Sequence, residues 1–190
     1  RGDANQAAAI MAWPTSGGAS APNDTRALEV LAAIFSDRLF DRLRAEQGAS
    51  YGPSVESYWP NGFEGSGGYV LAGSLLAPKD VSAFYDIAGG IAADLAKAPV
   101  SADELARNVG PIREQISRAT TGNAYWMYLL RGASRDQRIL RNALMLTQDV
   151  DRVTAADVQR VAQKYLTNRA GWKLAVLPSE DSAGQAIGAH

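Results

Sequence analysis

The sequence predicts an α+β fold, a two-layer sandwich in which helices pack on one face of a mainly antiparallel sheet. Two observations carry this prediction. Apolar residues follow the order strand, helix, two strands, several helices and a final strand along the 190 residues. Hydrophobic residues make up 46% and charged residues 21% of the chain, values typical of a globular domain. We therefore expect a single domain over residues 1–178 and a flexible tail over residues 179–190.

The first part of the chain predicts one strand and the clearest helix. Residues 6–13 form a short apolar run that Pro14 stops, which predicts a strand. Residues 22–25, Pro-Asn-Asp-Thr, include side chains that typically cap the start of a helix. Apolar residues then recur at helical spacing, and Gly48 is predicted to end the helix. The apolar positions of this helix are Leu28, Leu31, Phe35, Leu39 and Leu43.

An antiparallel strand pair is expected next. Residues 51–59 are rich in aromatic and β-compatible side chains, and residues 68–76 form a second apolar run. Residues 60–62, Pro-Asn-Gly, have turn chemistry. The glycine-rich residues 65–68 lack the lysine of a P-loop and the G-x-G-x-x-G spacing, so they predict a hairpin connection rather than a phosphate site.

Two longer helices follow this strand pair. The first runs from Val81 and is closed by Pro99, with its apolar residues on one side. Ser101 and Glu104 predict a capping box at the start of the second helix. Pro111 lies inside this second helix and should kink it or shift its start.

The last part of the chain predicts shorter helices and a closing strand. Helical stretches are expected around residues 125–131 and 137–146. Thr154 and Asp157 provide a weaker cap for one more helix. Residues 172–177 then form a strand run that Pro178 stops.

Charge and hydropathy exclude two classes of partner. The net charge is −1 and the sequence pI is about 5.9, so the chain has no electrostatic footprint for nucleic acid or for an anionic membrane surface. We expect no membrane span, because no apolar run approaches the roughly 20 residues that crossing a bilayer requires. Many acidic side chains, such as Glu29, Asp37 and Asp41, fall on the polar side of a predicted helix, where solvated charge is ordinary.

Cysteine and histidine limit the chemistry further. The chain has no cysteine, so a disulfide or a thiolate metal site is excluded. Its one histidine is the terminal residue His190, which excludes a histidine-based triad, a general-base histidine and a multi-histidine zinc site within the fold. We therefore expect no metal or cofactor site in this chain.

One segment combines residues that could serve chemistry. Arg44 lies at the end of the long helix, and Tyr51 opens the next strand across the glycine stop. The helix dipole alone favours an arginine in a last turn, and tyrosine is common in strands, so these positions also have an ordinary structural explanation. The arginines Arg38 and Arg42 are expected to be surface charge, and Tyr58, Trp59 and Trp126 are expected to be packing residues.

Residues 43–51, Leu-Arg-Ala-Glu-Gln-Gly-Ala-Ser-Tyr, resemble the hallmark of the C-terminal domains of the pitrilysin/insulysin family of zinc metalloproteases. In those domains an arginine and a tyrosine stand seven positions apart between a helix and a strand, as Arg44 and Tyr51 do here. The resemblance continues through the long helix, the strand pair, the helix after Ser101 and the final strand. It implies one half of a clamshell that closes around an extended peptide.

The resemblance also implies that the two halves of the enzyme have different roles. The first half of such enzymes carries the inverted zinc motif H-x-x-E-H, which this chain lacks. Arg44 and Tyr51 would then contact the peptide near the scissile bond and stabilise the negative charge that develops on its carbonyl oxygen. Zinc is expected in the partner half, whether that half belongs to the same precursor or to another chain. This chain alone is expected to be inert.

Two other functions remain open at this point. The same fold serves as a structural or assembly subunit in some respiratory core proteins, although the presence of Arg44 and Tyr51 argues against that role. A small-molecule-binding α+β domain is the other alternative, which an apolar pocket with converging polar groups would favour. The chain starts abruptly at Arg1, so we expect a fragment. Analogy with bacterial relatives favours the periplasm, with the cytoplasm as the alternative.

Overall fold

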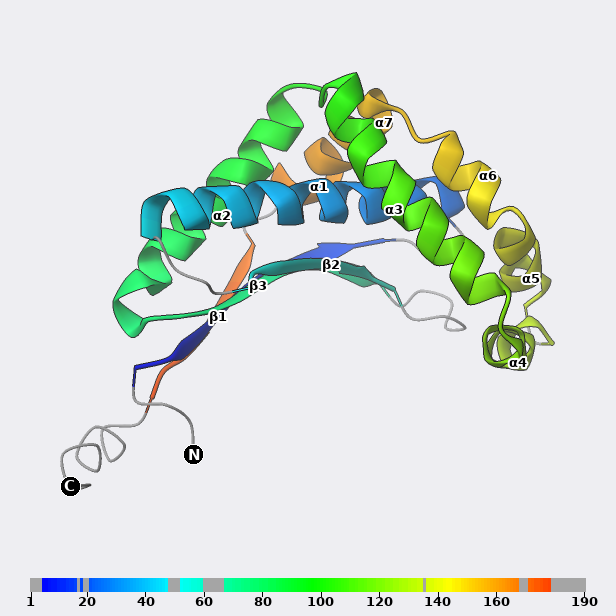
Figure 1. Ribbon diagram of the computed structural model, residues 1–190, viewed down its shortest axis with the longest axis horizontal. Helices are drawn as coiled ribbons and strands as arrows, with labels where there is room; N and C mark the ends of the chain where they lie inside the picture. Colours follow the sequence, from blue (N-terminus) through cyan, green and yellow to red (C-terminus); the bar gives the residue numbers. More distant parts are fainter. Residues whose placement is uncertain are drawn as a thin grey trace.

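The computed structural model describes residues 5–16, 18, 21–47, 52–59, 67–134, 136–167 and 171–178. In this part of the chain, one antiparallel sheet of four strands is covered on one face by helices, which confirms the predicted fold class (Figure 1). The strand order across the sheet is β2-β3-β1-β4. The strands are β1 (Ala7–Thr15), β2 (Ser54–Tyr58), β3 (Gly68–Leu76) and β4 (Trp172–Val176).

Most helices occupy the predicted regions of the chain. The helices are α1 (Pro22–Gln47), the short 3-10 helix η2 (Pro78–Asp80), α2 (Val81–Lys97), α3 (Ala102–Thr120), α4 (Asn123–Ala133), α5 (Gln137–Leu144), α6 (Leu146–Asp151), α7 (Ala155–Ala162) and the π-helix η3 (Gln163–Thr167). Of these, α6 is an additional helix that the sequence analysis did not predict. Helix α1 contacts β2, and α2 contacts β1, so these two helices form the inner part of the helical layer. The glycine stop at Gly48, the turn at residues 60–62 and the tail at residues 179–190 lie outside the described residues.

The core lies between the sheet and the helical layer. Every second residue of β1, from Ala7 to Thr15, is buried, because alternate side chains of a strand point to the same face. Trp13 is only 1% exposed and packs against Phe35 of α1, with 5.7 Å between the ring centroids. All five predicted apolar positions of α1 are buried: Leu28, Leu31, Phe35, Leu39 and Leu43.

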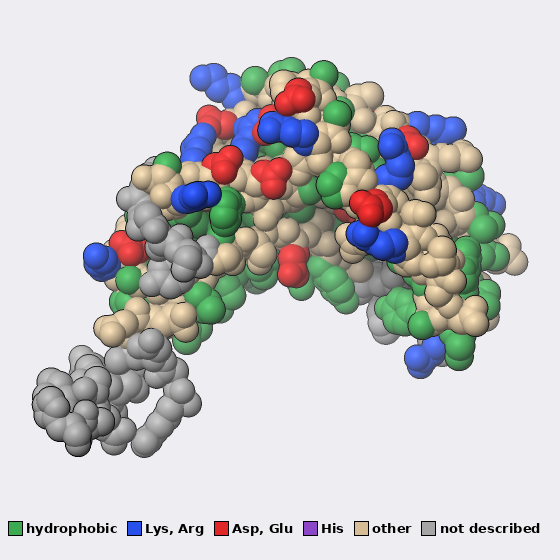
Figure 2. Space-filling model, in the orientation of Figure 1, with side chains coloured by type: hydrophobic (Ala, Val, Ile, Leu, Met, Phe, Trp, Pro, Cys, Tyr) green, Lys and Arg blue, Asp and Glu red, His purple; other side chains and the backbone are tan. Residues whose placement is uncertain are grey.

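The other side of the sheet, here called the open face, has no helix over it among the described residues. It carries exposed large apolar side chains from three strands: Tyr58, Tyr69, Leu75, Trp172, Leu174 and Val176. Tyr58 was expected to pack in the core, and this expectation is wrong. The Tyr58 ring instead lies 5.3 Å from that of Tyr69 on the open face. In Figure 2 charged side chains gather over the helices, and hydrophobic ones lie along the concave lower edge.

Strand β1 runs through Pro14, where the sequence predicts its end. Pro14 pairs in register with Tyr69 of β3, and Thr15 pairs with Gly68. Proline is tolerated here because β4 extends only as far as Trp172, opposite Ala12. Beyond Ala12, β1 is therefore an edge strand on that side, and no neighbouring strand needs an N–H group from Pro14.

The helix caps differ from the sequence expectations at two places. The Ser101 hydroxyl accepts a hydrogen bond from the Glu104 backbone N–H at 3.1 Å, but the Glu104 carboxylate binds Arg38 instead of completing a capping box. The cap at Thr154 and Asp157 is stronger than expected, since both halves of a capping box form. Helix α3 begins at Ala102 and continues past Pro111, so proline does not shift its start.

A buried carboxylate joins the first turn of α1 to the end of the helical layer. Asp24 is 8% exposed, and three side chains donate hydrogen bonds to it. The donors are Arg160 Nη1 at 2.6 Å, Lys164 Nζ at 2.8 Å and Tyr165 Oη at 2.7 Å. Burial by itself would raise the pKa of Asp24, but these hydrogen bonds lower it from 3.8 to about 2.

We expect Asp24→Asn to lower the free energy of unfolding by about 2 kcal/mol at neutral pH, because the ionised carboxylate is bound better in the folded state. A depressed pKa contributes stability that is fully present above pH 3.8 and is lost as the pH falls through about 2. Chemical denaturation of both proteins at pH 7, 4 and 2 should therefore show a difference that shrinks with acid. Asp37→Asn, an exposed change on the same helix, is the control. A constant difference across this range would contradict the assignment.

Candidate functional site

Arg44 lies in the last turn of α1 with its side chain exposed to solvent. Leu39 and Leu43 turn toward the core, so the stripe that contains Arg44 points away from the sheet. No described residue forms a hydrogen bond or an ion pair with Arg44. A guanidinium binds carbonyl or carboxylate oxygens through its planar set of N–H donors.

Tyr51, the second predicted site residue, lies outside the described residues. The chain is described again from Gly52, and β2 begins at Ser54. In sequence, Arg44 lies in the last turn of α1 and Tyr51 falls within the connection from α1 to β2, so the distance between them stays a prediction.

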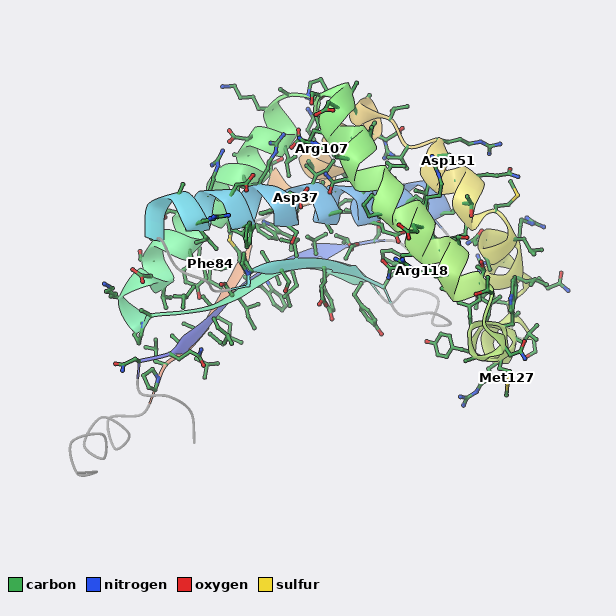
Figure 3. The ribbon with its side chains drawn as sticks, in the orientation of Figure 1. Asp37, Phe84, Arg107, Arg118, Met127 and Asp151 are labelled. Atoms are coloured by element: carbon green, nitrogen blue, oxygen red, sulfur yellow. The ribbon has the colours of Figure 1, made fainter. Side chains whose placement is uncertain are left out.

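A pocket of about 420 Å³ opens beside this connection. It lies between α1, the segment before β2 and the first turns of α3. Figure 3 shows two of its lining residues, Asp37 on α1 and Arg107 on α3. The full lining is Ser36, Asp37, Arg38, Phe40, Asp41, Pro53, Glu104 and Arg107.

Helical spacing connects the pocket to Arg44. Asp37 lies three and four positions before Phe40 and Asp41, and Arg44 lies four and three positions after them, so these residues lie along one exposed side of α1. Phe40 is 45% exposed, an unusual position for a large aromatic side chain. The carboxylates of Asp37 and Asp41 have no basic partner among the described residues.

Two ion pairs hold α1 in place around the pocket. Arg38 donates two hydrogen bonds to Glu104 of α3, at 2.7 and 2.8 Å, and Arg42 donates one to Asp94 of α2, at 2.5 Å. The contact with Arg38 lowers the pKa of Glu104, and the same contact raises the pKa of Arg38. Both groups of this pair are therefore charged at neutral pH, and the pair fixes the pocket wall on the α3 side.

The lining of the pocket is charged and polar, with one exposed aromatic ring. Acidic groups, the guanidinium groups of Arg38 and Arg107 and the ring of Phe40 line the pocket. In the described ranges, no three His, Asp or Glu side chains are placed to hold a metal ion. None of the helices there combines the length and apolar content that crossing a membrane requires.

Several of these residues were missed by the sequence analysis. Asp37 and Asp41 were expected to be solvated surface charge, and both are exposed, but their place at a pocket was not predicted. Arg38 and Arg42 were expected to be surface charge, and each forms an ion pair with another helix. Their spacing of four residues gave a signal that they share one side of α1. Nothing in the sequence indicated that Glu104 or Pro53 would meet that side, because both contacts are set by packing between distant elements.

The chain was also compared with known proteins. A protein-family model described as "Peptidase M16 inactive domain" matches residues 1–109, more than half of the chain. The comparison with curated proteins finds no match.

Solved structures share the fold at low sequence identity. The inactive peptidase domain of a candidate zinc protease from Bordetella parapertussis has a TM-score of 0.77 and 22% identity over 93% of this chain and 96% of that chain. The periplasmic protease PqqL from Escherichia coli gives 0.69 and 13%, over 92% of this chain and 19% of that one. A chain of Complex III2 from Candida albicans gives 0.74 and 16%, over 95% of this chain and 45% of that one. At such identities these similarities show the fold alone.

Proposed function

Because the chain belongs to the peptidase M16 family, matching its inactive domain, we propose that it is the non-catalytic partner domain of a zinc-dependent endopeptidase. The family match also bears out the resemblance carried by residues 43–51. In this proposal residues 1–178 form one domain, and the zinc ion is held by a partner half with an H-x-x-E-H motif.

The observation that carries this proposal is Arg44, which is exposed, has no partner among the described residues and lies one helical turn from the pocket residues Phe40 and Asp41. A guanidinium without a partner among the described residues can bind peptide carbonyls through its planar set of donors. The carboxylates of Asp37 and Asp41, which have no basic partner in the described part of the chain, and the ring of Phe40 add a surface suited to a basic peptide side chain. These features support an extended peptide as the ligand.

The proposed chemical role is to stabilise charge rather than to create a nucleophile. When bound in the partner half, zinc activates a water molecule for attack on the peptide carbonyl. Arg44 would orient the peptide backbone through hydrogen bonds, and the Tyr51 hydroxyl would donate to the oxygen on which negative charge develops. Both roles require the side chains to face the partner half, so the isolated chain should not hydrolyse peptides.

A second candidate function is that of a structural or assembly subunit. The similarity to a chain of Complex III2 from Candida albicans supports it, since that protein shares the fold. The exposed Arg44 argues for the peptidase role, because a pure scaffold has no need of an unpaired guanidinium there. For location we propose the periplasm, supported by the similarity to a periplasmic protease from Escherichia coli.

The proposal is tested by combining this chain with the H-x-x-E-H half from the same organism, produced either from the same precursor or as a separate protein. We expect the isolated chain to hold no zinc after dialysis and metal analysis, because carboxylates alone suit harder cations. A mixture of both proteins should hydrolyse a fluorogenic peptide library faster than the zinc protein alone. Tightly held, stoichiometric zinc in this chain would overturn the non-zinc assignment. Hydrolysis that does not respond to this chain would favour the scaffold function.

A further inference from the structure

Strand β4 is an edge of the sheet whose outer side is open. Its five residues pair with β1 on one side, and no described strand pairs with the other side. All five are exposed. An uncovered edge presents free backbone N–H and C=O groups, which other proteins block with charges, prolines or a covering element.

The side chains of β4 do not protect this edge. Trp172, Leu174 and Val176 lie on the open face and are 76%, 56% and 58% exposed. Lys173 and Ala175 point to the helix side but are also exposed, so the helical layer leaves this side of β4 largely uncovered in the described part of the chain. Lys173 is the only charged residue of the strand, and its Nζ lies 5.1 Å from the centre of the Tyr85 ring. In the part of the chain that the structure describes, the edge is therefore apolar and accessible.

We propose that β4 pairs antiparallel with β4 of a second copy of this chain, about a two-fold axis at Leu174. The two sheets then continue into one sheet, with both helical layers on the same side. Leu174 faces Leu174 of the other copy, and Trp172 faces Val176 of the other copy. Each apolar cross-strand pair of this kind stabilises a sheet by about 0.2–1 kcal/mol. Both copies contribute the same strand to this isologous contact, so the assembly is a closed dimer and not an open chain of copies.

The charges and the backbone of β4 select this register. With the axis at Leu174, Lys173 faces Ala175 of the other copy, so no like charges are opposed. An axis at Lys173 would place two ammonium groups directly opposite each other. An axis at Ala175 would bring Pro178, which has no N–H group, into the pairing. The register at Leu174 therefore uses all five residues without a charge conflict or a missing donor.

The position of β4 leaves the candidate functional site free. Strands β2 and β4 are opposite edges of the sheet, and the pocket with Pro53 lies on the β2 side. A second copy on β4 would thus not cover the α1 pocket. A two-strand contact is smaller than the roughly 800 Å² per partner of a standard interface, so we expect a micromolar dimer rather than a nanomolar one.

Cysteine cross-linking tests both the pairing and its register, because the chain has no native cysteine. In the 190-residue protein, Leu174→Cys should form a disulfide dimer at least about ten times faster than Lys173→Cys, since only residue 174 meets its own copy. Leu75→Cys is the second control, because Leu75 is half-exposed on the same face but lies on β3. In sedimentation, the mass of the unmodified chain should rise from 20.2 kDa toward twice that value with concentration.

Each outcome decides the proposal. Fast cross-linking at residue 174 with slow cross-linking at 173 and 75 supports it. Fastest cross-linking at residue 75 would overturn it in favour of open faces stacked on each other. A monomer up to about 500 µM, far above the micromolar range expected of a small interface, would also overturn it. As an independent check, Leu174→Lys should abolish association by opposing two ammonium groups, and Leu75→Lys should leave it unchanged.

Discussion

Tyr51→Phe is expected to lower the turnover of the reconstituted two-half enzyme by a factor of about 100 to 1000, with a much smaller effect on substrate binding. The lost hydroxyl would serve the transition state, where negative charge has developed on the peptide oxygen. The ring that remains can still contact the bound peptide. In free energy this corresponds to roughly 3 to 4 kcal/mol of transition-state stabilisation, the range measured for the loss of one such donor.

Arg44→Lys belongs to the same experiment. Lysine keeps the positive charge but cannot reproduce the planar set of donors, so turnover should fall here too. Arg131→Lys is a suitable control, because Arg131 is an exposed arginine on α4, distant in sequence from the site. Turnover and substrate binding are measured for each variant, with circular dichroism to verify folding. Near-normal turnover in both site variants would mean that residues 43–51 are only a helix end and a strand start.

Trp13→Ala is expected to lower the free energy of unfolding by about 3 to 5 kcal/mol, the range for large aromatic residues cut back in a core. Trp13 is fully buried between β1 and α1, and its ring packs against Phe35. Its removal leaves a cavity between two elements that the rest of the core holds apart. A loss of this size is a large share of the stability of most domains, so the variant should unfold near ambient temperature.

Trp172→Ala provides the matched control, since it removes the same side chain from an exposed position on β4. We expect this change to alter the unfolding free energy by less than about 0.5 kcal/mol in dilute protein. Urea denaturation of both variants at low micromolar concentration measures the difference. Equal losses from the two substitutions would contradict the burial of Trp13 and, with it, the packing of α1 on the sheet.

Much of the fold could be predicted because its signals are local. The stripe from Leu28 to Leu43 repeats at helical spacing, and the whole stripe is buried in α1. The four predicted strands all join one sheet. Predictions were less accurate at the ends of helices and strands, because contacts with neighbouring elements decide where each one starts and stops. Pro14 continues β1 because β4 is short, and Glu104 leaves its capping box because Arg38 is a charged partner.

The candidate site, like the fold, was predictable from sequence only in part. Sequence alone determined that the chain has no histidine cluster, and it identified Arg44 as a candidate through the motif that Arg44 shares with Tyr51. Tertiary structure decided that Asp37 and Phe40 share a pocket with Arg107, and that Asp24 is bound by three donors from the far end of the chain. Periodicity is a property of neighbouring residues, so a sequence displays it directly. Contacts across more than a hundred residues depend on how helices and strands pack, and only the folded chain fixes them.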